Sequence, residues 1–296
     1  NHNIQKQTTF NQHNPKQRPN KSLLLRLKSL PKTTSLLPFL RRTIRRTLTF
    51  FAHHHLKKMS TNNLLNFQTT SQGILPIKLC VLDCDGIIFN SNQLKTAAYR
   101  STLSDLNCST EEISKFVDLH LSDVSVSRFV KFTAFFKDIL NDPDSETKTT
   151  AALEGYSTNC MKLYKELTPE KGAMKFVDQS PTSPTLTFVI SGGAQTELNQ
   201  VFQIHGIRDK FHKICGSPIT KIEHLSEIIK ETNIDPTQIL FIGDGWTDFK
   251  TSKHIGCHFC FLKEMSDWKD NVQQMNGYEE MVTRCDTWDD ILKRCV

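Results

Sequence analysis

Short apolar runs alternate with amphipathic segments from residue 77 toward the C-terminal part of the chain. Runs of this length, rich in Ile, Val, Leu and Phe, are typical of strands buried on both faces of a parallel sheet. The segments between the later runs repeat apolar residues at helical spacing. This alternation predicts an α/β fold, a doubly wound parallel sheet with helices on both faces. The expected strands are 77–82, 185–190, 211–215, 238–243 and 257–262.

One interval in this alternation is too long for a single crossover helix. Residues 91–184 have helical periodicity and no convincing strand, and Ser109 with Glu112 has the spacing of a capping box before one helix. We therefore expect an α-helical cap over 91–184, inserted into a core made of residues 77–90 and 185–296. After Leu262 the pattern indicates helix and predicts no further strand.

Charge is distributed unevenly along the chain. Residues 1–82 contain 14 Lys and Arg and no Asp or Glu, whereas the remainder contains 23 basic and 31 acidic residues, a net charge of −8. The overall charge of +6 therefore comes from a basic leader over 1–76 and gives no support for a nucleic-acid-binding fold. No window approaches the ~20 apolar residues of a membrane span, so we expect no transmembrane segment.

The leader has two parts that differ in composition. Residues 1–20 are rich in Asn and Gln and poor in apolar residues, which predicts disorder. Residues 21–58 combine Leu, Arg, Ser and Thr without acidic residues, a composition that favours an organellar transit peptide for a mitochondrion or a plastid. The alternatives are a solvated basic arm, or translated sequence upstream of a start at Met59 that would leave the protein cytoplasmic.

The nine cysteines lack the paired spacing of a disulfide framework or a zinc site. Cys257 and Cys260 form a CxxC motif, but they lie in a predicted strand, where residues three apart point to opposite faces. We therefore expect reduced thiols in the core, with a redox or metal role as the alternative.

Two carboxylates follow the first expected strand. Asp83 and Asp85 are separated by one residue, so both point toward the crevice in which open α/β sheets bind ligands. Gly86 then allows the chain to turn. Taken alone, this motif has an alternative interpretation as an acidic turn without function.

Three further motifs are expected at the same edge of the sheet. Ser191 and Gly192 follow the second strand, where backbone N–H groups at a helix start favour an anion. Lys221 begins an expected helix after the third strand, and Asp244 and Asp248 follow the fourth. Because parallel strands bring their carboxyl ends to one edge, the four motifs are predicted to meet there.

In this order, the four motifs resemble those of the haloacid dehalogenase-like superfamily of phosphotransferases. The long helical insertion is similar to that of members with a helical cap, of the phosphoglycolate phosphatase and β-phosphoglucomutase type. The resemblance covers about residues 77–265 and implies a Rossmann-like core. The roles it implies are Asp83 as nucleophile, Asp85 as general acid and base, Lys221 as the charge-stabilising lysine, Ser191 with Gly192 as phosphate-binding groups, and Asp83, Asp85, Asp244 and Asp248 around a metal ion, Asp85 through its carbonyl oxygen.

The second aspartate also separates the activities of that superfamily. Its carbon–halogen hydrolases lack an aspartate at the position of Asp85, and its transport ATPases have Thr there. By this resemblance, Asp85 favours phosphatase or phosphomutase chemistry over dehalogenation.

The chemistry of the side chains points to a metal ion independently. Several carboxylates in one cleft raise one another's pKa values unless cations compensate their charge. Lys221 supplies one cation, and a hard divalent ion is expected to supply another. Mg²⁺ suits this site because it prefers carboxylate, water and phosphate oxygens.

We expect the substrate to be a small phosphate ester: a sugar phosphate, a sugar-acid phosphate or phosphoglycolate. Lys95 and Arg128 on the helical cap are the candidates for contacting it, with a solvated helix face as the alternative for each. A phosphomutase is the alternative activity, and a non-catalytic scaffold or membrane-surface protein that uses the basic leader is a second one. No oligomeric state is predicted.

Overall fold

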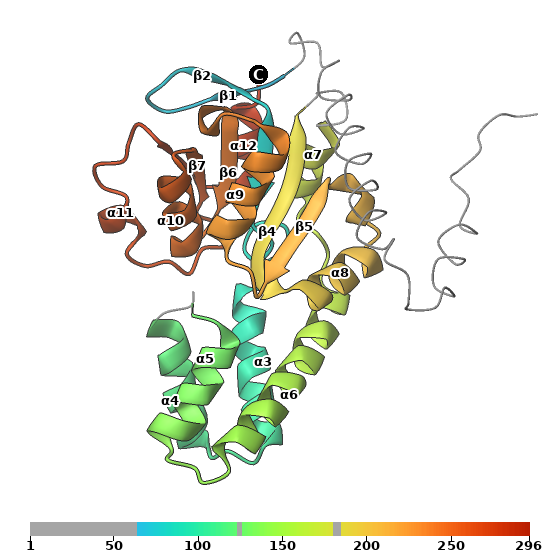
Figure 1. Cartoon of the computed structure of the whole chain (residues 1–296), viewed down its shortest axis with the longest axis vertical. Helices are drawn as coiled ribbons and strands as arrows, with labels where there is room; N and C mark the ends of the chain where they lie inside the picture. The colour runs from blue at the N-terminus through green and yellow to red at the C-terminus, as the bar shows by residue number, and fades with distance from the viewer. Residues whose placement is uncertain (1–63, 123–125, 180–184) are drawn as a thin grey trace, which may run out of the picture. The chain divides into compact units, whose positions relative to one another are not determined.

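The computed structural model describes residues 64–122, 126–179 and 185–296, and the structural statements below concern those residues (Figure 1). The disorder expected for 1–20 and the transit peptide expected within 21–58 lie outside them. No described helix is both long enough and apolar enough to span a bilayer. The strands are β1 (Leu65–Gln68), β2 (Ile74–Ile77), β3 (Leu79–Leu82), β4 (Leu186–Ala194), β5 (Lys213–Ser217), β6 (Ile239–Gly243), β7 (His258–Leu262) and β8 (Val282–Cys285). The α-helices are α3 (Asn92–Asp105), α4 (Thr110–Ser122), α5 (Arg128–Thr133), α6 (Ser145–Glu166), α7 (Lys171–Gln179), α8 (Gln195–Ile204), α9 (Lys221–Thr232), α10 (Trp246–Ile255), α11 (Asn271–Gln274) and α12 (Trp288–Lys293), and a π-helical segment (Ala134–Ile139) follows α5.

Six of these strands form one parallel sheet in the order β5-β4-β3-β6-β7-β8. β3 pairs with β4 on one side and with β6 on the other, so Leu82 lies between Val189 and Ile242. The strand order therefore reverses at β3, the kind of switch point at which doubly wound sheets bind ligands. The predicted α/β fold is confirmed, and each of the five expected strands is present with small shifts at its ends.

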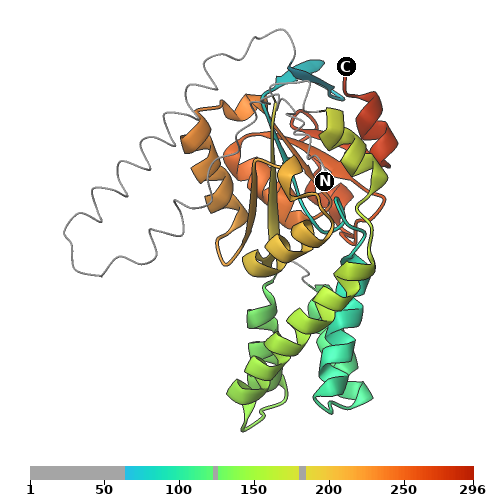
Figure 2. The ribbon, with the colours of Figure 1, turned by 90° about the vertical axis from the view of Figure 1, so that its right-hand side faces the viewer.

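Alternate residues of the central strand pack against different helices. Leu79 and Val81 belong to the core that α9 and α10 cover, whereas Cys80 and Leu82 belong to the core that α7, α8 and α12 cover. This period of two is what a strand buried on both faces requires. Figure 2 shows α9 on one side of the strands and α7 with α12 on the other.

Helices α3 to α6, with the π-helical segment, form the predicted cap, which is inserted after β3. α3 and α6 lie side by side (Figures 1 and 2), and the rings of Tyr99, Phe132 and Tyr156 pack between the cap helices. The expected capping box is present at the start of α4, where Ser109 N donates to Glu112 Oε2 at 2.7 Å and Glu112 N donates to Ser109 Oγ at 3.3 Å. An aromatic core thus stabilises the cap internally.

Three segments differ from the sequence expectation. β1 and β2 form an antiparallel hairpin inside the segment interpreted as leader, and Phe67 of this hairpin is fully buried against the core. Helix α7, expected within the cap, packs on α12, with Gly172 so near Trp288 that a Cβ would collide with its side chain. β8 adds an edge strand beyond Leu262, where helix was expected. Among the described residues, regular structure therefore begins at Leu65, and α7 lies with the core.

Candidate active site

Strand β3 places Asp83 at the carboxyl edge of the sheet. The carboxylate is buried, and its Oδ1 accepts a hydrogen bond from Cys84 N at 2.7 Å. Gly86 has a φ of +75°, and a Cβ at this position would collide with the carboxylate of Asp244. Glycine at 86 therefore both allows the turn after β3 and allows Asp244 to approach it.

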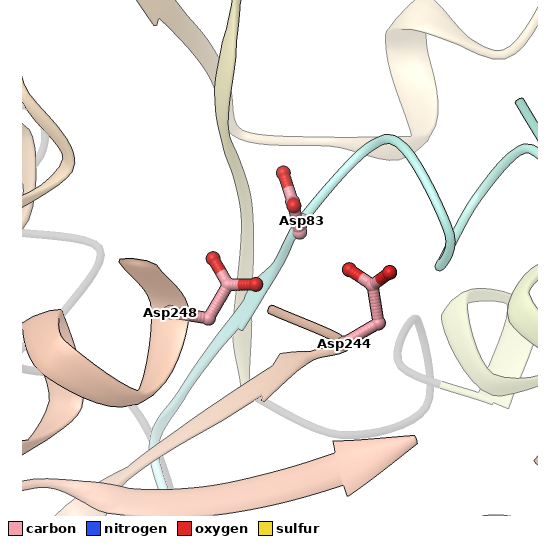
Figure 3. A group of neighbouring side chains, drawn as sticks. All are labelled: Asp83, Asp244 and Asp248. Atoms are coloured by element: carbon pink, nitrogen blue, oxygen red, sulfur yellow. The ribbon is translucent and has the colours of Figure 1, made fainter. Parts of the chain in front are cut away.

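Two further carboxylates lie beside Asp83. Asp244 directly follows β6, and Asp248 lies in the first turn of α10, where its Oδ2 accepts the N–H of Gly245 at 3.1 Å. Ligand oxygens of Asp83, Asp244 and Asp248 lie within 4.8 Å of one another. We call these three residues the carboxylate cluster, and Figure 3 shows that they come from three segments that meet at the end of β3.

Lys221 is the cation beside the carboxylate cluster. Thr220 and Glu223 form a capping box, so that α9 begins at Lys221. The Nζ of Lys221 lies 2.9 Å from Asp83 Oδ1 and 2.6 Å from Asp248 Oδ1. Residues from the motifs after β3, β5 and β6 thus share direct contacts at one edge of the sheet.

Burial and like charge govern the ionisation of the carboxylate cluster. Burial and the neighbouring Asp248 raise the pKa of Asp83 to about 7, although Lys221 acts in the opposite direction. Burial and Asp83 raise the pKa of Asp244 well above its ordinary value. Burial alone would lower the pKa of Lys221, but Asp248 and Asp83 outweigh this effect and raise it. One lysine therefore does not compensate the charge of three buried carboxylates.

The carboxylate cluster fits a hard divalent cation. Its ligand atoms are all carboxylate oxygens, they lie close together, and the raised pKa values of Asp83 and Asp244 reflect a deficit of positive charge. Mg²⁺ binds oxygen ligands of this kind, commonly with water and substrate phosphate completing its shell. Asp83, Asp244 and Asp248 are therefore able to hold the ion.

Asp85 lies next to the carboxylate cluster but has separate partners. Its carboxylate accepts hydrogen bonds from Ser91 Oγ at 2.5 Å and from the hydroxyl of Tyr164, and it pairs with the ammonium of Lys95. Burial acts to raise the pKa of Asp85, but Lys95 and the two hydroxyl donors outweigh burial, so the pKa is lowered. Asp85 is therefore ionised in this arrangement, and Lys95, a candidate for substrate contact, is bonded to it.

Ser191 and Gly192 occupy the end of β4 rather than a helix start. β4 continues to Ala194, and α8 begins at Gln195. Ser191 is buried, and its Oγ accepts a hydrogen bond from Gly193 N at 3.0 Å. A Cβ built at Gly192 would meet nothing within 4 Å, so the space in front of this exposed glycine is open. Gly192, and not the Ser191 side chain, faces the cavity described below.

Arg128, the second candidate for substrate contact, is bonded to a residue of the core. Its Nη1 and Nη2 lie 2.6 and 2.8 Å from the two carboxylate oxygens of Glu197 on α8. The hydroxyl of Ser157 also donates to Glu197, and the guanidinium lies 4.6 Å from the centroid of Tyr156. Arg128 therefore joins α5 of the cap to α8 through a buried ion pair.

Sequence reasoning did not assign roles to several residues at the site. Asn92 begins α3, and its Nδ2 donates to Asp244 Oδ2 at 2.8 Å. No motif marks Glu197 or Tyr164, and Tyr164 is 79 residues from Asp85 in the sequence. Only Asn92 carries a local signal, because it lies shortly after the first motif, where the cap begins.

The core and the cap enclose a cavity of about 180 Å³ above these residues. The core side presents the carboxylate cluster, Asp85, Lys221, Gly192, Trp246 and Trp268, and the cap side presents Asn92, Lys95, Tyr99, His120, Arg128 and Tyr156. Polar groups converge on the core end of this cavity, as they do in small-molecule sites. A phosphate group at that end would lie among Asp83, Lys221 and the open side of Gly192.

Comparison with known families gives one match over most of this region. The sequence model of haloacid dehalogenase-like hydrolases matches residues 80–262, a span that includes all four motifs. None of the curated proteins matches the chain.

Solved structures provide a second comparison. A predicted phosphoglycolate phosphatase from Haemophilus somnus is similar with a TM-score of 0.59 and 16% identity, covering 73% of this chain and 97% of that one. A haloacid dehalogenase-like family protein from Streptococcus pneumoniae is similar with a TM-score of 0.55 and 13% identity, covering 73% of this chain and 97% of that one. At these identities the likeness concerns the fold.

Proposed function

Since this chain belongs to the haloacid dehalogenase-like hydrolases, we propose that it is a Mg²⁺-dependent phosphatase that hydrolyses a small phosphorylated metabolite. The observation that carries the proposal is the contact of Lys221 with both Asp83 and Asp248 inside a cavity that also contains Asp244 and Asp85. Carboxylates without a reaction to perform have no evident reason to be crowded in a buried site.

Asp83, Asp244 and Asp248 would hold the ion, with the carbonyl oxygen of Asp85 as a further ligand taken from the family resemblance. Bound there, Mg²⁺ supplies positive charge to the substrate phosphate. Lys221, which contacts Asp83 and Asp248, adds a second positive charge. Together these charges allow the anionic Asp83 to approach an anionic phosphate.

Asp83 is the proposed nucleophile. One of its carboxylate oxygens forms a bond to phosphorus while the bond from phosphorus to the alcohol oxygen breaks, giving an aspartyl-phosphate. The departing alkoxide takes a proton from the carboxylic acid form of Asp85. Water then attacks phosphorus, and ionised Asp85 removes its proton, releasing inorganic phosphate and regenerating Asp83.

The contacts of Asp85 fit its proposed role as a base in the second half of this cycle. Paired with Lys95 and accepting hydrogen bonds from Ser91 and Tyr164, Asp85 is held in the ionised form that can act as a base. To act as the acid in the first half, Asp85 has to gain a proton and weaken its bond to Lys95. Substrate binding in the cavity is the event that would bring about this exchange of partners.

The test is phosphate release by the purified full chain from a broad panel of phosphorylated metabolites, with Mg²⁺ and with a chelator. We expect release from at least one ester with Mg²⁺, a loss of release on chelation, and no release by Asp83→Asn. Asp178→Asn is the matched control, because Asp178 is an exposed aspartate that pairs with Lys210 outside the cavity. No release from any ester by the wild type would overturn the proposal.

The same reactions address the alternative activities. A phosphomutase would form isomers of hexose phosphates with little free phosphate, because the phosphoryl group returns to a sugar. Membership in a hydrolase family gives no support to a non-catalytic scaffold. Residues 1–63 of the basic leader lie outside the described structure, so a membrane-surface role for the leader rests on composition alone.

A further inference from the structure

Each cation that lines the cavity in the described part of the chain is bonded to a carboxylate. Lys95 pairs with Asp85, and Lys221 pairs with Asp83 and Asp248. The third cation, Arg128, pairs with Glu197. At the core end, a substrate phosphate can draw on Lys221 and would draw on the proposed metal ion. A second anionic group on the substrate, at the cap end, would find Arg128 already neutralised.

Several contacts stabilise the ion pair between Arg128 and Glu197. The two terminal guanidinium nitrogens each contact one of the two carboxylate oxygens, a bidentate arrangement that is strong for this pair, and both side chains are largely buried. Ser157 donates a further hydrogen bond to Glu197, and the face of Tyr156 covers the guanidinium. Burial alone would lower the pKa of Arg128, but Glu197 outweighs it and raises it, so the guanidinium stays charged beside its partner.

The remaining groups at the cap end are neutral. Burial, assisted by Lys131, lowers the pKa of His120 to about 3, so this imidazole carries no charge near pH 7. Tyr99 stacks on Tyr156 with 4.1 Å between centroids. On the core side, Trp246 and Trp268 pack against each other with 5.8 Å between centroids, and both line the cavity. Neutral rings and hydroxyls favour an uncharged alcohol with apolar faces, such as a sugar or another polyol.

We propose that the site selects phosphate esters whose alcohol part is uncharged, and that Glu197 is the positioning residue that imposes this choice by neutralising Arg128. This inference rests on the proposed phosphatase activity. A carboxylate at the cap end would have to displace Glu197 or share Arg128 with it, and either outcome leaves a buried negative charge without full compensation. Among the expected substrates, sugar phosphates are therefore favoured over sugar-acid phosphates and phosphoglycolate.

Matched pairs of esters test the choice in the full-length wild type. Glycerol 3-phosphate and 3-phosphoglycerate differ by a hydroxymethyl against a carboxylate, as do glucose 1-phosphate and glucuronic acid 1-phosphate. We expect kcat/KM to be higher for the uncharged member by about ten- to a hundredfold, the range of a charged hydrogen bond converted to a ratio. p-Nitrophenyl phosphate reports the phosphatase reaction separately, because its leaving group is a good one and needs little recognition.

The variant Glu197→Gln tests the role of Glu197 in this substrate preference. Gln is isosteric, its carbonyl oxygen can still accept from Arg128 and its amide can donate to the hydroxyl of Ser157, but it leaves the positive charge of Arg128 uncompensated. The preference for the uncharged member should fall by about tenfold or more, mainly through KM of the carboxylate-bearing ester. In the double variant with Arg128→Gln, the preference should return toward that of the wild type. Asp142→Asn, which removes a carboxylate paired with Lys148 elsewhere on the cap, should leave it unchanged.

The results distinguish a failure of this inference from a failure of the proposed phosphatase function. Hydrolysis of p-nitrophenyl phosphate with a wild-type preference for the carboxylate-bearing esters would overturn the inference and leave the phosphatase standing. The same holds if Glu197→Gln keeps the wild-type preference, since a purely structural pair would alter stability without altering the ratio. If p-nitrophenyl phosphate and every metabolite remain intact, the proposed function fails and this inference fails with it.

Discussion

Asn92, the first residue of the cap, donates a hydrogen bond from its Nδ2 to Oδ2 of Asp244 at 2.8 Å and another to the carbonyl of Met265 at 2.9 Å. The start of α3 is thus joined directly to a carboxylate of the proposed metal site and to the loop after β7. An outer hydrogen bond of this kind holds a ligand carboxylate in one orientation. The start of the cap is therefore linked by a direct hydrogen bond to one residue of the carboxylate cluster.

Replacement of Asn92 tests that relationship. Asn92→Ala removes both hydrogen bonds and should weaken Mg²⁺ binding by about tenfold, because Asp244 loses the partner that orients it. Titration calorimetry with MgCl₂ measures this directly, without any substrate. Asn90→Ala is the control, since Asn90 is exposed two residues earlier in the same turn. Equal Mg²⁺ affinity in the two variants would show that Asn92 has no part in the metal site.

Lys221 is expected to act on rate more than on binding of the ion. Lys221→Met removes the cation that contacts Asp83 and Asp248, and should lower kcat by about a hundredfold or more, as expected for loss of one preorganised charge. Steady-state phosphate release at saturating Mg²⁺ gives the value. Lys213→Met removes a more exposed lysine, paired with Glu231 at 3.5 Å, and should retain wild-type kcat. Full activity in Lys221→Met would argue against its role.

His258 predicts how stability depends on pH. Burial lowers the pKa of His258 to about 4; its Nε2 contacts Thr283 Oγ1 at 2.9 Å, and its Nδ1 has no hydrogen-bond partner in the described structure. In the unfolded chain the pKa of histidine is about 6.5, so between these two values the unfolded state binds more protons than the folded state. Stability should therefore fall as the pH falls from about 6.5 toward 4, by up to about 3 kcal/mol from this residue.

The measurement is urea unfolding of the wild type and His258→Gln at pH 7.5 and pH 5.0. The substitution has its own cost at both pH values, so the informative quantity is the loss of unfolding free energy between them. That loss should be smaller in His258→Gln by about 2 kcal/mol. If both proteins lose the same amount, the imidazole is not held neutral by burial.

The composition of the basic leader predicts that the protein is targeted to an organelle. Residues 1–63, which precede the described structure, should carry a fluorescent reporter to a mitochondrion or a plastid, because the segment is rich in Arg and free of acidic residues. A version with Arg41, Arg42, Arg45 and Arg46 changed to Glu should lose the localisation. A diffuse cytosolic signal from the unaltered leader would instead favour the solvated arm or a start at Met59.

Much of the fold was predictable because buried parallel strands leave a strong local pattern. The runs that became β3, β6 and β7 are fully buried, and their residues are almost all apolar. β8 has the sequence Val-Thr-Arg-Cys, with Arg284 exposed at the edge of the sheet, so it lacks that pattern. β1 and β2 are short, β2 contains Pro76, and the hairpin lies in the acid-free segment interpreted as leader, whose composition dominated the prediction for that region.

The residues of the candidate site also differ in whether a local sequence pattern predicts them. Asp83, Lys221 and Asp248 were predictable because each follows a recognisable strand at the edge where parallel strands converge. The partnership of Arg128 with Glu197 was not, since it joins helices 69 residues apart through side-chain geometry that no local spacing encodes. For the same reason, the bond between Lys95 and Asp85 was not predictable, and the substrate contact expected of Lys95 stays a prediction.

The formation of a phosphoryl bond on Asp83 tests the central claim most directly. The full chain is mixed with Mg²⁺ and p-nitrophenyl phosphate, quenched with acid within the first turnover, digested, and analysed by mass spectrometry. The peptide that contains Asp83 should gain one phosphoryl group, more so in Asp85→Asn, in which water is no longer activated, and not at all in Asp83→Asn. Two results would contradict the account. One is an unmodified Asp83 peptide from an Asp85→Asn protein that still releases nitrophenol, and the other is phosphate release by Asp83→Asn.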